Sequence, residues 1–180
     1  MNRISHRPQE LALPIASLAA LRGALIEAVG EDAAAEALRA AGYAAGDALY
    51  TSLAAGNFDA ELPAEQFWSR LAQLFAGRGW GSLRHEAAHP GVGALNSMDW
   101  VEADALAGAF RPSCFLTTGM LANLLGRVAG DEIAVLEVEC RSRGDARCRF
   151  LFGGPGTLDT VYEHVASGES ADASLAALDG

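Results

Sequence analysis

The chain has 180 residues, of which 51% are hydrophobic and 20% are charged, and its formal net charge at pH 7 is −10. Nucleic acid and anionic membrane surfaces attract basic patches, so this acidic balance predicts neither as a partner. No run of apolar residues approaches the ~20 that a membrane-spanning helix needs. The length predicts one domain of ordinary size, and the lack of a recognisable targeting segment favours the cytoplasm.

The first part of the chain has apolar residues at the spacing of amphipathic helices. Residues 1–12 lack this periodicity and are predicted to be a flexible tail. Glycines punctuate the periodic stretches that follow, as glycine often does just past the end of a helix. These stretches predict four helices, at residues 15–29, 31–41, 43–55 and 63–76.

From residue 80 onward, short β-rich segments replace the helical pattern. Two hairpins are predicted, the first around a Pro-Gly turn and the second around an Arg-Gly-Asp turn. A strongly apolar helix is predicted between the hairpins, and another helix follows the second one. The predicted strands are residues 80–87, 92–100, 133–140 and 146–152, and the predicted helices are residues 114–129 and 158–166.

This order predicts an α+β fold, in which N-terminal helices pack on an antiparallel sheet made of the two hairpins. One helix lies between the hairpins and one follows them. We expect residues 13–167 to form a single domain, and residues 168–180, which are rich in small side chains, to form a C-terminal tail.

Three cysteines dominate the candidate chemistry. Cys140 and Cys148 end one predicted strand and begin the next, so a hairpin would bring them together. Cys114 begins the preceding helix. Thiolates are soft ligands suited to zinc, and a carboxylate from Glu137 or Glu139 would complete a closed, structural tetrahedron.

Two other interpretations of the cysteines stay open. Free cysteines are commonly buried as small hydrophobic residues, and Cys140 could instead form a disulfide with Cys148. The metal interpretation also carries a geometric condition. Glu137 and Cys140 are three residues apart, so a regular strand would place them on opposite faces. Both can reach one ion only if the strand bulges or ends near Glu139.

The spacing Glu137-x-x-Cys140, seven residues and then Cys148, after a helix that begins with Cys114, resembles the 4-vinyl reductase domain family. This domain is the sensor module of transcription activators that respond to phenol, toluene and xylene, and TRAPP vesicle-tethering subunits are similar in fold. The resemblance covers roughly residues 80–165, and Gly144 also matches. It implies that Cys114, Glu137, Cys140 and Cys148 bind zinc, with Glu137 rather than its neighbouring glutamate as the fourth ligand.

The resemblance also implies an apolar pocket for an aromatic ligand beside the zinc site, and a homodimer. The aromatic residues that could line such a pocket are Phe67, Phe75, Trp80, Trp100 and Phe115. The sensors grip phenol with a tryptophan and an upstream histidine. This chain has Leu95 or Asn96 near the tryptophan position and no histidine before His85 except His6, so phenol recognition does not carry over.

These observations predict a zinc-containing sensor or carrier of a small hydrophobic molecule, which acts through a dimer or a regulatory partner protein. No motif for nucleophilic, metallohydrolase or nicotinamide chemistry is present, so binding is favoured over catalysis. Two alternatives stay open. One is an accessory or reductase-like factor in (bacterio)chlorophyll or other tetrapyrrole synthesis, and the other is a protein-interaction adaptor.

Overall fold

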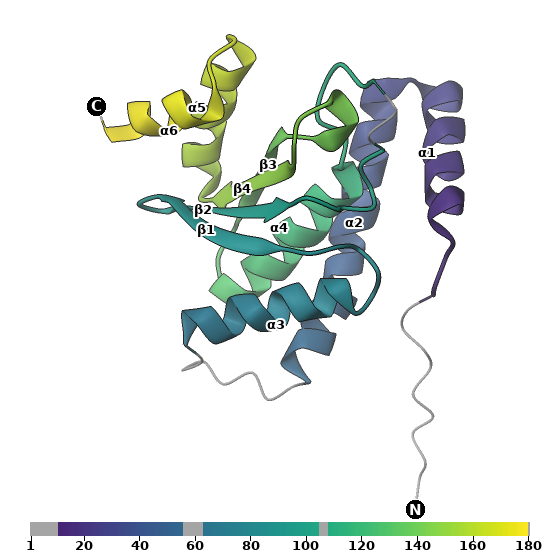
Figure 1. The fold of residues 1–180 in the computed structure, drawn as a ribbon, viewed down its shortest axis with the longest axis horizontal. Coiled ribbons are helices and arrows are strands. Elements are labelled where there is room, and N and C mark those ends of the chain that lie inside the picture. Colours follow the sequence, from purple (N-terminus) through teal and green to yellow (C-terminus); the bar gives the residue numbers. More distant parts are fainter. Residues whose placement is uncertain (1–10, 56–62, 105–107, 180) are drawn as a thin grey trace, which may run out of the picture.

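A computed structural model describes residues 11–55, 63–104 and 108–179 (Figure 1). These residues form an α+β fold, as predicted. The helices are α1 (Ile15–Val29), α2 (Glu31–Ala54), α3 (Ala64–Ala76), α4 (Phe115–Ala129), α5 (Pro155–Ala166) and α6 (Ala171–Ala176). The strands are β1 (Arg84–His89), β2 (Val92–Ser97), β3 (Ala134–Glu139) and β4 (Cys148–Gly153), and short 3-10 turns lie at Arg141–Arg143 and Ala177–Asp179. No helix among the described residues is long and apolar enough to cross a membrane.

The four strands form one antiparallel sheet in the order β1-β2-β4-β3. Both predicted hairpins are present, and the second strand of each lies in the middle of the sheet. Side chains alternate between the two faces of β4. Phe150 points into the core beneath α3 and α4, whereas Leu151 points into a second core beneath α5 and α6. Figure 1 shows these helices on opposite sides of the sheet.

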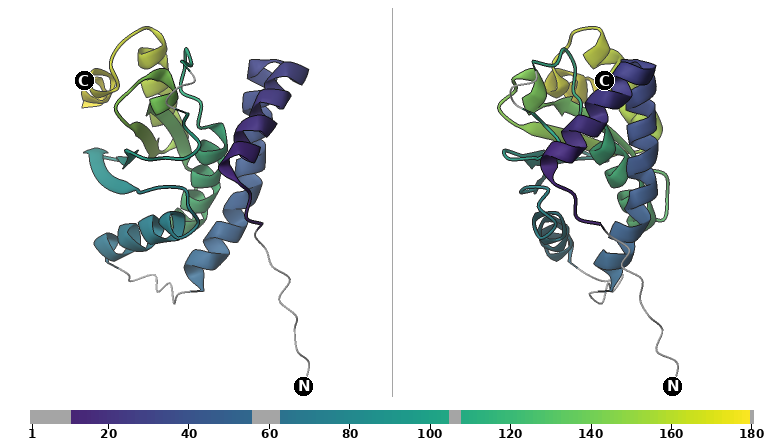
Figure 2. Two further views of the ribbon diagram at one scale, coloured as in Figure 1. Left: turned by 45° about the vertical axis from the view of Figure 1, so that its right-hand side comes forward. Right: turned by 90° about the vertical axis from the view of Figure 1, so that its right-hand side faces the viewer.

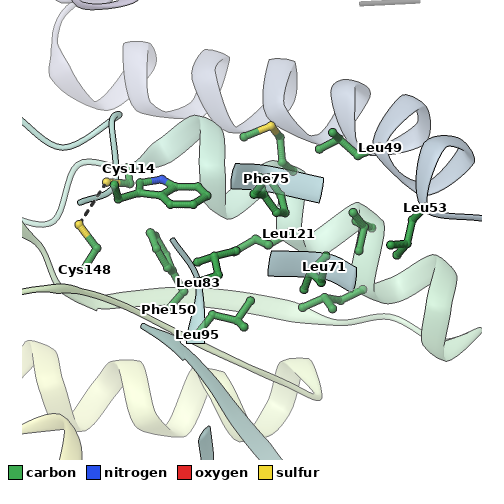
Figure 3. Close-up of a cluster of buried hydrophobic side chains, with 14 of the residues drawn as sticks. Leu49, Leu53, Leu71, Phe75, Leu83, Leu95, Cys114, Leu121, Cys148 and Phe150 are labelled. Carbon is green, nitrogen blue, oxygen red and sulfur yellow. Dashed lines mark hydrogen bonds between the residues drawn. The ribbon is translucent and has the colours of Figure 1, made fainter. Parts of the chain in front are cut away.

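The larger core fills the space between α2, α3, α4 and the sheet (Figure 3). Its fully buried side chains include Leu71 and Phe75 from α3 and Leu121 from α4. Figure 3 shows Cys114 and Cys148 at one end of this cluster and Leu53 at the other. The cysteines are therefore part of the wall of the main core.

The expected helix end at Gly42 is wrong, because α2 runs unbroken from Glu31 to Ala54. Gly42 lies where α2 crosses α4: a Cβ atom added there would lie only 2.0 Å from the carbonyl oxygen of Leu116. Gly119 of α4 has the same relation to Arg39, with 2.1 Å to its carbonyl oxygen. These glycines let two helix backbones approach closely, a tertiary requirement that resembles a helix stop in sequence.

The two ends of the chain differ in how they pack. Residues 1–10 of the expected N-terminal tail lie outside the described residues. At the other end, part of the segment expected to be a tail is folded: α6 begins at the N-cap Ser170, and Leu175 is buried in the second core. Helix α1, by contrast, has no buried residue and lies along α2 (Figures 1 and 2).

Candidate metal centre

A β-bulge in β3 meets the geometric condition that the metal site imposes. The pairing of β3 with β4 shifts register between Glu137 and Glu139, and the strand ends before Cys140. The bulge re-aims the side chains that follow it. Glu137 therefore points into the core with Cys140, while Glu139 pairs with Arg147 through two bonds of 2.9 Å on the other side.

Four side chains converge at the end of α4 nearest the sheet: Cys114, Glu137, Cys140 and Cys148. All are buried, and one ligand atom from each lies within 4.8 Å of the others. The Sγ atom of Cys114 lies 3.9 Å from that of Cys140 and 4.0 Å from that of Cys148. Sulfurs at ~2.3 Å from a tetrahedral zinc would be ~3.8 Å apart, so the observed spacing suits a shared ion rather than a disulfide.

The carboxylate of Glu137 has one oxygen tied down and one left over. Its Oε2 accepts a 2.8 Å hydrogen bond from the backbone N–H of Cys114, which fixes the side chain. Its Oε1 is buried and has no hydrogen-bond partner among the described residues. A buried acceptor without a partner is costly and uncommon, and here it belongs to the carboxylate of the cluster. The orphaned oxygen fits a metal ligand.

The electrostatics of the cluster also favour a cation. Burial raises the pKa of Glu137, and contact with Cys140 raises it further. Hydrogen bonding to Cys140 and Cys148, with burial, raises the pKa of Cys114. The pKa of Cys140 is lowered because both other thiols donate to it. The protein alone thus stabilises one thiolate at most, whereas a bound divalent cation would stabilise several anions together.

The loop between β3 and β4 is held in place by its own hydrogen bonds. The backbone N–H of Cys140 donates to Asp145 at 2.7 Å, and Arg143 donates to the same carboxylate at 2.9 Å. Gly144 has a φ of 95°, a left-handed conformation that favours glycine. The turn thus returns the chain so that Cys148 faces Cys140 without a metal having to impose the shape.

Sequence reasoning missed one residue that organises the site. Glu102 is buried and accepts hydrogen bonds of 2.8 Å from the backbone N–H groups of Leu116 and Thr117, in the first turn of α4. Thr117 also donates its hydroxyl to Glu102 and accepts a 2.7 Å bond from the indole of Trp100. Glu102 thus caps the helix that presents Cys114. An acid this far upstream of the helix carries no local signal for the role.

Four of the five expected pocket residues lie together. Phe67, Phe75, Trp80 and Trp100 all pack in or against the main core, with Trp100 5.4 Å from Phe75 and 5.8 Å from Trp80 between ring centroids. Phe115 lies apart, in a small cluster between α2 and the start of α4. Next to the main group, Trp68 stacks on His85 at 3.9 Å.

The comparisons with known proteins agree with this geometry. Residues 98–153 match the family model of the 4-vinyl reductase domain. The expected resemblance to this family is thereby confirmed over the matched segment, which contains all four clustered residues. None of the curated proteins compared matches the chain.

Among solved structures, the chain is similar to the crystal structure of the phenol-responsive sensory domain of the transcription activator PoxR with phenol. The TM-score is 0.68 at 20% sequence identity, and the match covers 80% of this chain and 76% of that one. At this identity the similarity concerns the fold, which extends well beyond residues 98–153.

Proposed function

We propose that this protein is a zinc-containing domain that binds a small hydrophobic or aromatic molecule as a sensor or carrier. The observation that carries the proposal is the buried set of three thiols and one carboxylate, with ligand atoms within 4.8 Å of one another. Soft sulfur donors select zinc over magnesium or calcium, and four protein ligands leave no open position for catalysis. The zinc is therefore structural.

Zinc in this position would tie three elements together. Cys114 caps the start of α4, Glu137 and Cys140 end β3, and Cys148 begins β4. Residues Cys148 and Trp100 belong to the same core cluster. A metal that fixes this wall would pre-shape the neighbouring aromatic region, which reduces the ordering cost of ligand binding.

The ligand would bind among the aromatic residues between α3 and the sheet, near Phe67, Phe75, Trp80 and Trp100. The similarity of fold to a sensory domain solved with phenol supports this choice. Phe75 and Trp100 are fully buried and in contact, so a ligand must displace side chains or shift α3. Binding would then be reported by the two stacked tryptophans.

The first experiment measures metal content by mass spectrometry in the wild type and in Cys140→Ser. We expect about one zinc per chain in the wild type and a large loss in the variant, because a neutral hydroxyl is a poor substitute for a thiolate. A metal-free wild type whose stability equals that of Cys140→Ser would contradict the proposal and return the cysteines to the core.

The second experiment screens substituted benzenes and larger apolar rings by tryptophan fluorescence of the zinc-loaded protein. A saturable change in emission is expected for at least one of them. No change across the screen, with zinc bound, would rule out the aromatic site while leaving the metal site in place. An absorption spectrum of the purified protein tests the tetrapyrrole alternative, which requires a coloured ligand.

A homodimer, with a regulatory partner protein downstream, forms part of the proposal. Helix α1 supports it: none of its residues is buried, and large apolar side chains such as Leu21 and Val29 are exposed. Sedimentation of the zinc-loaded protein tests this arrangement. A mass of one chain at high concentration would contradict the dimer and favour the role of a monomeric carrier.

A further inference from the structure

A separate cavity lies between α1 and the segment that follows β2. Its volume is about 440 Å³, within the range of small-molecule sites. The apolar part of its lining comes mainly from α1, with Leu38 of α2 and Val101 and Ala103 beyond the sheet. None of the four clustered metal ligands and none of the aromatic side chains of the main core lines it. It is therefore a different site from the one proposed above.

A buried carboxylate forms part of the cavity wall. Glu102 lines the cavity although its residue is only 8% exposed. Its Oε2 accepts two hydrogen bonds from Thr117, but its Oε1 accepts only one, from Leu116. A carboxylate oxygen has two lone pairs, so Oε1 keeps one acceptor position.

Arg22 of α1 lines the same cavity. Its positive charge acts on Glu102 and lowers the pKa of that carboxyl against the larger effect of burial. The guanidinium carries five N–H donors, and none of them takes part in the three bonds that Glu102 accepts. The cavity thus offers hydrogen-bond donors on the α1 side and an acceptor on the other side.

The charges of the lining select the class of ligand. Arg22 contributes one positive charge, and Glu102 and Asp104 contribute two carboxyl groups. An anionic ligand would meet two carboxylates, and a cationic ligand would meet the guanidinium. A neutral head that both accepts and donates hydrogen bonds satisfies both sides, and an apolar body suits Ile15, Leu18 and Leu38.

We propose that this cavity is a second binding site, for a neutral amphiphile with an apolar body and a primary amide or hydroxyl head. The head accepts from Arg22 and donates to Glu102. Because Glu102 also holds Thr117, which holds the indole of Trp100, occupancy reaches the aromatic core through two hydrogen bonds. The site therefore links α1 to the region where the first ligand is proposed to bind.

The test titrates the zinc-loaded full chain by calorimetry with three eight-carbon probes: octanamide, octanoate and octylammonium. Octanamide should bind saturably and about tenfold more tightly than either charged probe, since only its head pairs with both sides. Equal or tighter binding of a charged probe would overturn the assigned ligand class. The absence of saturable octanamide binding would overturn the site.

A matched pair of variants on α1 locates the binding. Ala19 lines the cavity and Ala20, its neighbour, does not, and both are exposed. Ala19→Phe should fill the cavity and weaken octanamide binding about tenfold or more, while Ala20→Phe should leave it unchanged. Equal effects of the two variants, or none, would place the probe elsewhere and overturn the inference.

Metal content separates this inference from the proposed function. A chain with one zinc that shows no Ala19-dependent binding would refute the second site alone. A chain without zinc that binds octanamide in an Ala19-dependent way would refute the zinc domain and keep the cavity. Circular dichroism confirms beforehand that both variants keep their helices, which is expected because α1 has no buried residue.

Discussion

At the scale of single residues, two neighbouring glutamates of β3 show how a bulge divides roles. Glu137 faces the cysteines with an unpaired oxygen, whereas Glu139 is held by Arg147 and Arg149. The spacing of residues alone left the choice between them open. The bulge between them explains why a carboxylate three residues before a cysteine can share its site.

Glu137→Gln tests this division, with Glu139→Gln as its control. The amide keeps the shape and can still accept from the N–H of Cys114, but it loses the negative charge that a divalent ion requires. We expect zinc affinity to fall by at least about tenfold in Glu137→Gln and to stay within about twofold in Glu139→Gln. Competition with a coloured zinc chelator measures both, and a similar loss in the two variants would contradict the assignment.

Glu102 predicts a dependence of stability on pH. Burial raises its pKa to about 7, from an ordinary value of 4.5. The folded protein therefore holds this proton more tightly than the unfolded chain does. The stability that the neutral form contributes is complete below about pH 4.5 and is lost as the pH rises to about 7.

Glu102→Gln removes this titration while leaving Arg22 and the metal ligands in place. The unfolding free energy of the wild type, relative to the variant, should decrease from pH 4.5 to pH 7 by up to about 3 kcal/mol. Urea unfolding at several pH values measures the difference. If the difference between the two proteins is independent of pH, the carboxyl does not titrate in this window.

At the scale of elements, the close crossing of α2 and α4 gives the sharpest prediction. Gly42→Ala would drive a methyl group into the backbone of Leu116, so we expect a loss of about 3 kcal/mol or more in unfolding free energy. Gly23→Ala in α1 is the control. Nothing lies within 4 Å of the added methyl there, and alanine should stabilise the helix by about 0.5–1 kcal/mol.

Chemical denaturation of both glycine variants measures these changes. A mild effect at Gly42 would mean that α2 and α4 separate more easily than their spacing indicates. Since α4 begins at Cys114, the metal content of Gly42→Ala should fall together with its stability.

The same elements show what the sequence could and could not predict. Local signals were enough for both hairpins, for α1 and α4 and for the four clustered side chains, because periodicity and spacing are properties of neighbouring residues. Gly42 misled because a close helix crossing and a helix end use the same residue. Leu175 and Glu102 were missed because their roles come from contacts with distant parts of the chain.

At the scale of the whole molecule, removal of the metal should weaken the entire domain. The ligands come from α4, β3 and β4, so binding of zinc to the folded state adds stability that depends on its free concentration. We expect a strong chelator in mild denaturant to lower the unfolding temperature by several degrees. Thermal unfolding followed by circular dichroism measures this, and an unchanged midpoint after confirmed zinc removal would contradict a structural metal.

The strand order β1-β2-β4-β3 has a kinetic consequence. All four clustered side chains lie between residues 114 and 148, so α4, β3 and β4 can meet around a metal through short loops. The first hairpin must then find its place beside β4 across a much longer stretch of chain, which costs more loop entropy. Folding would proceed from a metal nucleus outward, and the aromatic core, which needs both hairpins, would close last.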